Sequence, residues 1–311
     1  MLRQIRRIVL SAKNDTLKYL VFEAGGRAGL SAELFFVNRV CRDKGDSLIL
    51  ADMDPTYRLC PAPAGVRRVG EDEALALIAA DPSDCSVFPA DELARQGKPA
   101  VFDLAARDPR VAVDHWFYDK RRMNETLASV TDGCTIRIPE TFSLDDVFMR
   151  PNTMSAGSHG VGRLANTCIT RRVEIAREYV VDVNWTAGEP AVYAREVKIK
   201  NGYDKYLRFL PRDSKVSSAV DEFIHTIKTA VPLLVTGIFH IQLIENPAGE
   251  VFFVEYSKRI SGTSIVNLFR GYNPFDAFAG IPTPAYKGDF AREDVWYRYE
   301  DFVANLHQAR L

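Results

Sequence analysis

One short stretch of the chain combines residue types that can bind a metal ion and phosphate. The segment VFFVEYSKRISGTS, residues 251–264, begins as an apolar strand and ends in charged and hydroxyl side chains. Its glutamate, Glu255, precedes a serine, a lysine and an arginine at positions 257–259. A carboxylate inside a protein is costly unless a positive charge compensates it. Two partners for Glu255 remain open, an ion pair with Arg259 and a bound cation.

The residues before this stretch predict a β-hairpin that turns at NPAG. If the strands pair directly from that turn, Gln242 lies opposite Phe253 and His240 lies opposite Glu255. Strand alternation then gathers four polar side chains on one face: His240, Gln242, Glu255 and Ser257. Carboxylate, amide and hydroxyl oxygens suit Mg²⁺, which takes its remaining ligands from water and substrate phosphate. Histidine is a poor magnesium ligand, so we expect His240 beside the ligands.

A glycine-rich loop, residues 148–164 (FMRPNTMSAGSHGVGRL), is the second informative stretch. Gly157, Gly160 and Gly162 leave backbone amides open to a ligand, and successive free amides attract anions. Arg150 at the base of the loop favours phosphate. The chain contains no Walker motif, and the loop alone is compatible with either a phosphate site or a plain hairpin connection.

The elements that must position these residues begin with a βαβ unit over residues 18–55. Its first strand is continuously apolar, as in a sheet covered on both faces. One stripe of its helix carries four apolar residues: Leu30, Leu34, Phe35 and Val37. The glycine turn departs from the dinucleotide pattern G-x-G-x-x-G at Ala24, although Asp52 and Asp54 lie where a ribose-binding acid would. A tight strand-to-helix turn, another ligand site and a dinucleotide site all remain open.

The remaining chain continues the α/β pattern to about residue 112 and then changes. We predict helices over residues 71–80, 119–130 and 217–231. Beyond residue 148, period-2 strand patterns dominate, which predicts a mostly antiparallel sheet. In EYVVDVNW, alternation turns Asp182 and Asn184 away from the apolar side, and solvent is their simplest environment.

Bulk composition limits the partners. Lys plus Arg is 40 and Asp plus Glu is 41, so the charge gives no reason to expect a nucleic acid. The apolar runs are shorter than the roughly 20 residues that span a bilayer. Five cysteines without a C-x-x-C pair argue against structural zinc and a disulfide framework, which makes the cytoplasm the expected location.

The order of these segments resembles the ATP-grasp superfamily, specifically its carbamoyl-phosphate-synthetase-like and biotin-carboxylase-like branch of carboxylate-amine ligases. The resemblance covers about residues 115–265. Its matching segments are DKRRMNETLA, MRPNTMSAGSHGV, EIAREYVVDV and IQLIENPAGEVFFVEYSKRISGTS. The resemblance implies a fold of class α/β and α+β. A Rossmann-like preATP-grasp domain, residues 1–112, would precede an ATP-grasp domain with antiparallel sheets, residues 113–311.

The resemblance also implies positions that contact ATP. Lys120 and Arg150 match basic residues that reach the phosphates. Gly157 and Ser158 match the flexible loop that closes over them. Val173 lies where the backbone meets adenine.

Further matches concern the ribose and the metal ions. Glu178 lies where the ribose hydroxyls are held, while Arg171 replaces an acidic residue at the start of the adenine hinge. Gln242 and Glu255 match metal ligands, with Glu255 bridging two Mg²⁺ ions. Ser257 replaces the asparagine of the family's Asn-Pro-Arg sequence.

The implied activity is an ADP-forming ligase that uses ATP and Mg²⁺ (or Mn²⁺) to join a small-molecule carboxylate to an amine through an acylphosphate, with Arg259 stabilising the acylphosphate stage. Arg195 is either an acceptor-carboxylate contact or a solvated strand residue. Ser261 and Thr263 are either substrate contacts or a helix N-cap.

The partners are small molecules, without nucleic acid or membrane, and a homodimer remains open. A non-catalytic ATP sensor and a dehydrogenase built on residues 18–55 are the alternatives.

Overall fold

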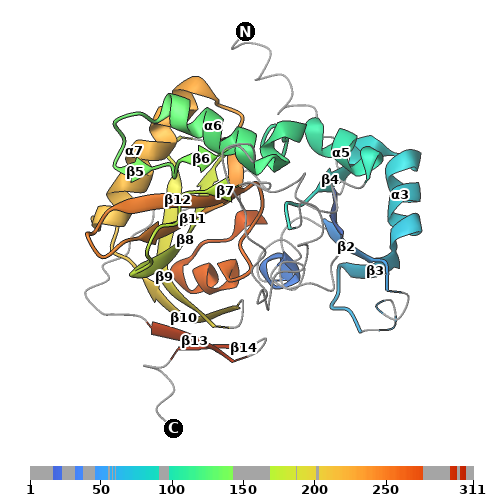
Figure 1. The fold of residues 1–311 in the computed structure, drawn as a ribbon. Helices are drawn as coiled ribbons and strands as arrows, with labels where there is room; N and C mark the ends of the chain where they lie inside the picture. The colour runs from blue at the N-terminus through green and yellow to red at the C-terminus, as the bar shows by residue number, and fades with distance from the viewer. Residues whose placement is uncertain are drawn as a thin grey trace, which may run out of the picture.

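The fold was obtained as a computed structural model (Figure 1). It describes the following residues: 17–22, 32–37, 46–54, 57, 59, 61–90, 98–142, 169–186, 188–200, 203–275, 295–299 and 302–305. The predicted glycine turn of the βαβ unit therefore lies outside the described residues, as does the glycine-rich loop with Arg150, Gly157 and Ser158.

Within the described residues, four parallel strands form a small sheet in the order β3-β2-β1-β4. Its strands are β1 (Lys18–Phe22), β2 (Ser47–Asp52), β3 (Val66–Gly70) and β4 (Cys85–Val87). The central strands β1 and β2 are buried along nearly their whole length. This burial agrees with their continuously apolar sequences, because a parallel sheet is normally covered on both faces.

Helices flank the small sheet. The α3 helix (Glu71–Ala80) has the predicted bounds, and its first turn contains three acidic residues that favour a helix N-terminus. It packs with α5 (Pro99–Ala106), while helix 32–37 lies between the two sheets (Figure 1). Phe35 of that helix is buried, but Leu34 is 45% exposed. The prediction that Leu34 shares the buried stripe is therefore wrong, because adjacent helical residues point about 100° apart.

Eight of the described strands form a larger, mostly antiparallel sheet in the order β14-β13-β10-β9-β8-β11-β12-β5. The strands in sequence order are β5 (Ile136–Arg137), β8 (Arg177–Trp185), β9 (Ala191–Lys200), β10 (Tyr203–Phe209), β11 (Gly237–Glu245), β12 (Val251–Ser257), β13 (Val295–Tyr299) and β14 (Phe302–Asn305). A short antiparallel pair, β6 (Thr141–Phe142) and β7 (Ile169–Thr170), lies apart from it. The predicted class, α/β followed by α+β, is confirmed.

The two faces of the large sheet are covered differently. The helices α6 (Lys120–Val130) and α7 (Lys215–Ala230) pack on one face over an apolar core (Figure 1). The other face carries polar residues and is covered by the chain that follows β12, including the short helix η6 (Ser264–Arg270). None of the described helices is long and apolar enough to cross a bilayer.

The chain after β12 also joins the large sheet to the small one. We call residues 258–275 the bridging segment. Its Ile260 and Phe275 belong to the hydrophobic core of the small sheet. The Phe275 ring stacks on Phe88, with centroids 4.1 Å apart. A second close contact occurs at Gly237, which has a φ of 89° and packs against the backbone of Arg110.

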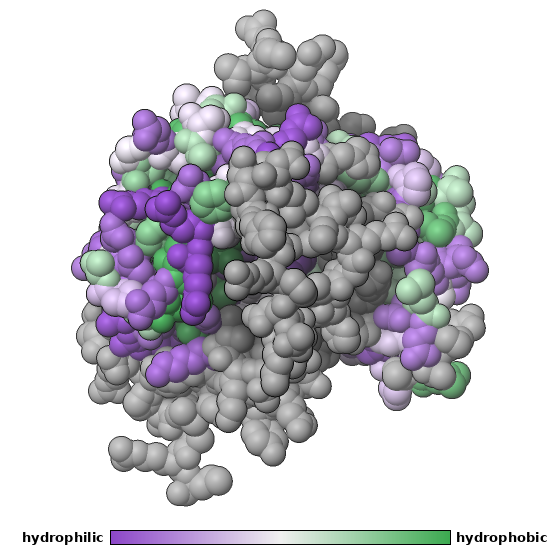
Figure 2. Space-filling view, in the orientation of Figure 1, coloured by the Kyte–Doolittle hydropathy of each residue, from purple (hydrophilic) through white to green (hydrophobic). Residues whose placement is uncertain are grey.

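On the face of the molecule in Figure 2, hydrophilic residues cover most of the described surface of both halves, with hydrophobic residues interspersed among them. Among the residues whose burial the structure describes, few large hydrophobic side chains are exposed and they are separated in sequence; they include Met53, Leu59, Ile175 and Val254. Scattered exposure of this kind is ordinary for a globular protein.

Candidate functional site

The hairpin of β11 and β12 brings Gln242 and Glu255 directly opposite each other. Near the turn, Leu243 pairs with Phe253, so Val254 is an extra residue on β12 and the register shifts at this point. An extra residue of this kind is a β-bulge, which bends the strand and re-aims side chains. The predicted pairing of Gln242 with Phe253 is wrong for two reasons: Glu245 pairs with Val251, one residue further along β12 than direct pairing from the turn gives, and the bulge adds a second residue.

The shift at the turn and the bulge together move the pairing by two residues, which leaves the predicted polar face intact. Beyond the bulge His240 pairs with Ser257, and not with Glu255 as predicted. Directly opposed residues of an antiparallel pair point to the same face, as do residues two apart on one strand. His240, Gln242, Glu255 and Ser257 therefore do share a face of the hairpin. Gln242 and Glu255 are half-buried, whereas His240 and Ser257 are fully buried.

Glu255 is paired with Lys120, whose ammonium nitrogen lies 3.4 Å from Oε2 of the carboxylate. The side chains are 67% exposed for Lys120 and 32% for Glu255, so solvent reaches both charges. Arg259, the partner considered from the sequence, instead donates a hydrogen bond from Nη1 to the carbonyl of Ile260 over 2.9 Å. The charge beside Glu255 thus comes from a residue 135 positions earlier in the chain.

The start of α6 positions Lys120. Asp119 is the N-cap, and its carboxylate accepts a hydrogen bond from the backbone N–H of Arg122 over 3.0 Å. Asp, Asn, Ser and Thr are favoured at this position because they satisfy a free backbone donor. Met123 and Leu127, predicted at i and i+4, are buried against the sheet. The cap and this apolar stripe fix the helix end that presents the lysine to β12.

A pocket of about 130 Å³ opens beside the Lys120–Glu255 pair. Its lining comprises Phe117, Lys120, Met123, Asn124, Thr170, Phe253, Val254, Glu255 and Tyr256. An apolar lining with a few charged groups is usual for small-molecule sites. The volume is below the roughly 300 Å³ of the smaller ligand clefts, so this pocket accommodates only part of a nucleotide-sized ligand.

The donor set of the hairpin fits a hard cation. The carboxylate of Glu255 and the amide of Gln242 face each other, and both offer oxygen ligands. The Ser257 hydroxyl is buried and has no hydrogen-bond partner within the described residues. Those residues contain no cluster of three or more His, Cys, Asp or Glu side chains. A cation here would therefore take few protein ligands, which is the usual situation for Mg²⁺ bound to phosphates.

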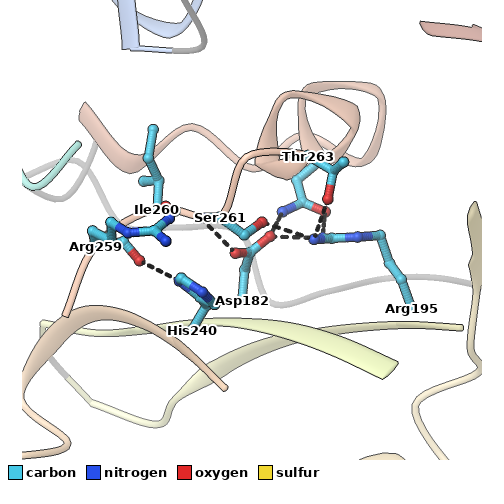
Figure 3. Close-up of polar contacts among 8 residues, drawn as sticks. Asp182, Arg195, His240, Arg259, Ile260, Ser261 and Thr263 are labelled. Atoms are coloured by element: carbon cyan, nitrogen blue, oxygen red, sulfur yellow. Dashed lines mark hydrogen bonds and ion pairs between the residues drawn. The ribbon is translucent and has the colours of Figure 1, made fainter. Parts of the chain in front are cut away.

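Deeper on the same face lies a buried ion pair (Figure 3). Arg195 of β9 is 0% exposed, and its Nη1 lies 2.6 Å from Oδ2 of Asp182 on β8. Asp182 and Asn184 are only 2% and 3% exposed. The prediction that these two residues are solvated is wrong, because the bridging segment covers this face. For the same reason Arg195 does not lie on a solvated strand.

The residues Ser261 and Thr263 complete this buried cluster. Both hydroxyls accept hydrogen bonds from Nη2 of Arg195, over 3.0 Å and 3.3 Å. Thr263 precedes η6, but its side chain makes no capping hydrogen bond. The structure thus brings these three predicted substrate contacts together in the interior, bonded to one another.

Burial and charge also act on the titrating groups of this cluster. Burial opposes ionisation of Asp182, but the charge of Arg195 and the hydrogen bonds from Arg195 and Ser261 hold the pKa of this carboxyl below its usual value. Burial and the nearby charge of Arg259 lower the pKa of His240 to about 4. His240 is therefore neutral at pH 7. Its Nδ1 lies 3.0 Å from the carbonyl oxygen of Arg259, which identifies Nδ1 as the protonated nitrogen.

The predicted adenine and ribose positions lie in the connection from β7 to β8 and at the start of β8. Val173 is half-buried in the connection, and Glu178, also half-buried, is the second residue of β8. Arg171 forms an ion pair with Glu140 over 3.0 Å. The backbone N–H of Ala176 donates to the carbonyl at the end of β11, which ties this connection to the hairpin that carries Gln242.

Comparisons with known proteins support the fold. No protein-family model and no curated protein matches the sequence. Solved structures do match. N5-carboxyaminoimidazole synthetase from Staphylococcus aureus, complexed with ADP, has a TM-score of 0.61 at 13% identity, covering 90% of this chain and 81% of that one.

Two further solved structures have the same architecture. The L-amino acid ligase from Bacillus licheniformis has a TM-score of 0.56 at 11% identity, covering 92% of this chain and 80% of that one. Biotin carboxylase from Campylobacter jejuni, in a complex named for β,γ-ATP, has a TM-score of 0.60 at 10% identity, covering 92% and 76%. These identities are too low to carry activity or family membership, but the shared architecture shows that the chain has the same fold as this synthetase, this ligase and this carboxylase, which is the fold that the sequence resemblance implied.

Proposed function

We propose that the protein is an ATP-dependent ligase that joins a small carboxylate to an amine and releases ADP and phosphate. The observation that carries the proposal is the Lys120–Glu255 pair, which stands opposite Gln242 at the mouth of a pocket. Similar solved structures include a synthetase with bound ADP and an amino acid ligase. Glu255 and Gln242 would hold a cation, whose chemical contribution would be positive charge that neutralises the phosphates.

The proposed reaction has two steps. A carboxylate oxygen of the substrate attacks the γ-phosphorus of ATP, and the bond from that phosphorus to the β,γ-bridging oxygen breaks, which gives an acylphosphate and ADP. The amine nitrogen then attacks the acyl carbon, phosphate leaves, and the nitrogen loses a proton as the amide forms. The protein's part is positioning and charge stabilisation. Lys120 and Arg150 hold ATP phosphates, and Arg259 stabilises the transferring phosphoryl group.

The exposure of Lys120 suits a residue that contacts the phosphates of ATP. An exposed lysine pair with a carboxylate is weak, so little free energy holds the ammonium group at Glu255. When a nucleotide occupies the pocket, Lys120 turns to the phosphates and leaves the Glu255 oxygens to a cation. Val173 lies on the connection that adenine would contact, and Glu178, near the start of β8, lies where it could hold the ribose hydroxyls.

A second candidate function is ATP binding without catalysis. Its motivation is Ser257, which stands where the family has an asparagine and whose hydroxyl is fully buried. Fewer exposed oxygen ligands would weaken a second metal site while leaving nucleotide binding possible. This candidate predicts MgATP binding without phosphate release in the presence of any pair of a carboxylate and an amine.

The proposal extends to the domain boundary near residue 112. In the N-terminal part of the chain, the last residue that belongs to the core of the small sheet is Val111. The first residue of the core between the large sheet and its helices is Val113. Two cores that change over at adjacent residues support a boundary there.

The test compares the wild type with Glu255→Gln by calorimetric titration with MgATP, followed by phosphate-release assays with amino acids offered in pairs. We expect the wild type to bind MgATP and Glu255→Gln to lose most of that affinity and all turnover. Glu250→Gln is the matched control, because Glu250 lies on the same hairpin and forms an ion pair with Arg137 at 2.6 Å. Equal MgATP affinity in the wild type and Glu255→Gln would refute the metal assignment.

A further inference from the structure

The buried ion pair of Asp182 and Arg195 needs an explanation beyond stability. Taking two opposite charges out of water costs several kcal/mol for each ion, and an apolar pair of similar volume is often at least as stable. Nevertheless both side chains are almost completely buried, and the ion pair lies on the same face of the large sheet as Gln242 and Glu255. The question is what the pair does for that face.

The ion pair holds the bridging segment by five hydrogen bonds (Figure 3). The backbone N–H of Ser261 donates to Oδ1 of Asp182 over 3.2 Å, and Nδ2 of Asn267 donates to Oδ2 over 2.7 Å. Arg195 donates from Nη1 to Oδ1 of Asn267 over 3.0 Å. From Nη2 it donates to the hydroxyls of Ser261 and Thr263. One strand pair therefore fixes both ends of residues 261–267.

The Asp182 contact to Ser261 and two neighbouring hydrogen bonds fix the backbone at Arg259, two residues before Ser261. The Nδ1–H of His240 donates to the carbonyl oxygen of Arg259 over 3.0 Å. The N–H of Ile260 donates to the carbonyl of Pro89 over 2.8 Å, and the next N–H donates to the Asp182 carboxylate. Two successive peptide units, 259–260 and 260–261, are thus held in place. The Arg259 guanidinium itself bonds to the Ile260 carbonyl, so its position follows that backbone.

We propose that Asp182 and Arg195 are positioning residues, which clamp residues 259–267 onto the sheet and thereby set where the Arg259 guanidinium lies relative to Glu255. Charged groups that act on a transferring phosphoryl group are effective when they are already oriented, and such orientation requires a well-supported surrounding shell. The inference rests on the proposed function, because that function assigns Arg259 to the phosphoryl group.

A double-mutant cycle tests the coupling. Dissociation constants for MgATP and MgADP are measured by calorimetry for the wild type, Asp182→Asn, Arg259→Met and the double variant, and their ratio reports contacts to the γ-phosphate. We expect Arg259→Met to lower the preference for MgATP roughly tenfold, the size of one lost hydrogen bond to a charged group. Asp182→Asn should lower this preference for MgATP over MgADP by at least about threefold. In the Arg259→Met background the same substitution should not lower the preference further, because the two residues act as one unit.

A matched control separates positioning from general loss of stability. Glu33 and Arg68 form another buried ion pair, with two hydrogen bonds of 2.9 Å and 3.0 Å, beside the small sheet. Glu33→Gln should lower the melting temperature, as Asp182→Asn does, but should leave the MgATP/MgADP ratio at the wild-type value. A milder second variant combines Ser261→Ala with Thr263→Val, which removes hydrogen bonds from Arg195 and keeps the ion pair.

The outcomes distinguish the inference from the function on which it rests. Failure of the wild type to prefer MgATP, or an unchanged ratio in Arg259→Met, overturns the role of Arg259 and the clamp with it. The clamp alone is refuted by two results, both with Arg259→Met lowering the preference for MgATP over MgADP. In the first, Asp182→Asn leaves that preference unchanged; in the second, Asp182→Asn lowers it equally with and without Arg259→Met. If Asp182→Asn does not fold, the combined Ser261→Ala and Thr263→Val variant decides by the same criterion.

Discussion

Gln242 and Glu255 face each other across the hairpin because Val254 is inserted as a bulge between Glu255 and the regular pairing at the turn. If Val254 instead paired regularly, the register at the turn would set it opposite Gln242 and set Glu255 opposite Ile241, so Gln242 and Glu255 would point to opposite faces. A bulge increases local twist, and the helix N-terminus that carries Lys120 meets β12 at this point. The relation between bulge, helix end and polar face leads to predictions about binding and about stability.

Replacing Lys120 should separate binding from stability. Lys120→Met removes a mostly exposed ion pair, which contributes at most about 1 kcal/mol to the free energy of unfolding. The variant should therefore melt close to the wild type but bind MgATP roughly tenfold more weakly, because a charged contact to phosphate is lost. Calorimetry and thermal denaturation measure the two effects. The control is Arg121→Met, on the same helix and paired with Glu125 at 2.9 Å, which should leave both unchanged.

Deleting Val254 should test the bulge directly. The deletion makes the hairpin regular and keeps Glu255 opposite Gln242, so the polar and apolar faces of β12 are preserved. We expect a folded protein that binds MgATP several-fold more weakly, because the carboxylate is no longer aimed at Lys120. Val254→Thr keeps the bulge and should bind MgATP as the wild type does. Wild-type affinity in the deletion variant would show that the bulge has no role in the site.

Acid should destabilise the protein through His240. The folded pKa is about 4 and the unfolded pKa is that of an ordinary histidine, 6.5. Above pH 6.5 the ring is neutral in both states and the full stability is present. As the pH falls towards 4, the unfolded state binds the proton first, and the free energy of unfolding should fall by about 3 kcal/mol.

Urea denaturation at a series of pH values measures this slope. His240→Gln should flatten it between pH 6.5 and 4, while His225→Gln, which alters a half-exposed histidine, should not. The lowered pKa of Asp182 adds a loss of the same sign at more acidic pH. A wild-type stability that is constant from pH 7 to 4 would contradict the assignment of a buried, neutral His240.

The contact between Gly237 and Arg110 should be intolerant of a side chain. A Cβ at residue 237 would lie 1.8 Å from the carbonyl oxygen of Arg110, and the φ of 89° is itself unfavourable for other residues. Gly237→Ala should cost roughly 3 kcal/mol or more. Gly133 has a similar φ of 83° but no atom within 4 Å of its Cβ position, so Gly133→Ala should cost only about 1 kcal/mol. Equal losses in urea denaturation would show that the close approach is unimportant.

Local patterns in the sequence predicted the elements well. The bounds of α3 agree with the prediction, because its apolar spacing and acidic first turn are local signals. The hairpin turn is also as predicted: the N–H of Gly249 donates to the carbonyl of Asn246 over 2.9 Å. The common face of His240, Gln242, Glu255 and Ser257 was predicted correctly although the register was not, because the true pairing is shifted by two residues and an even shift returns the same side chains to one face.

The features that the sequence did not reveal depend on contacts between distant segments. Asp182 was expected in solvent because alternation shows which side a residue faces, but not what covers that side. The covering segment begins almost 80 residues later, as the separation of 79 between Ser261 and Asp182 shows. One signal was available: opposite charges at Asp182 and Arg195 on adjacent predicted strands. The pairing of Lys120 with Glu255 likewise required knowledge of how α6 docks on β12.

The bridging segment limits how the chain can be divided into fragments or combined with another protein. Ile260 and Phe275 lie late in the chain, yet both are buried in the core that surrounds β1 and β4. A fragment starting at residue 113 would carry these side chains without their covering and would be prone to aggregate. Grafting either half onto a relative would succeed only if the residues that line this shared core were transplanted together.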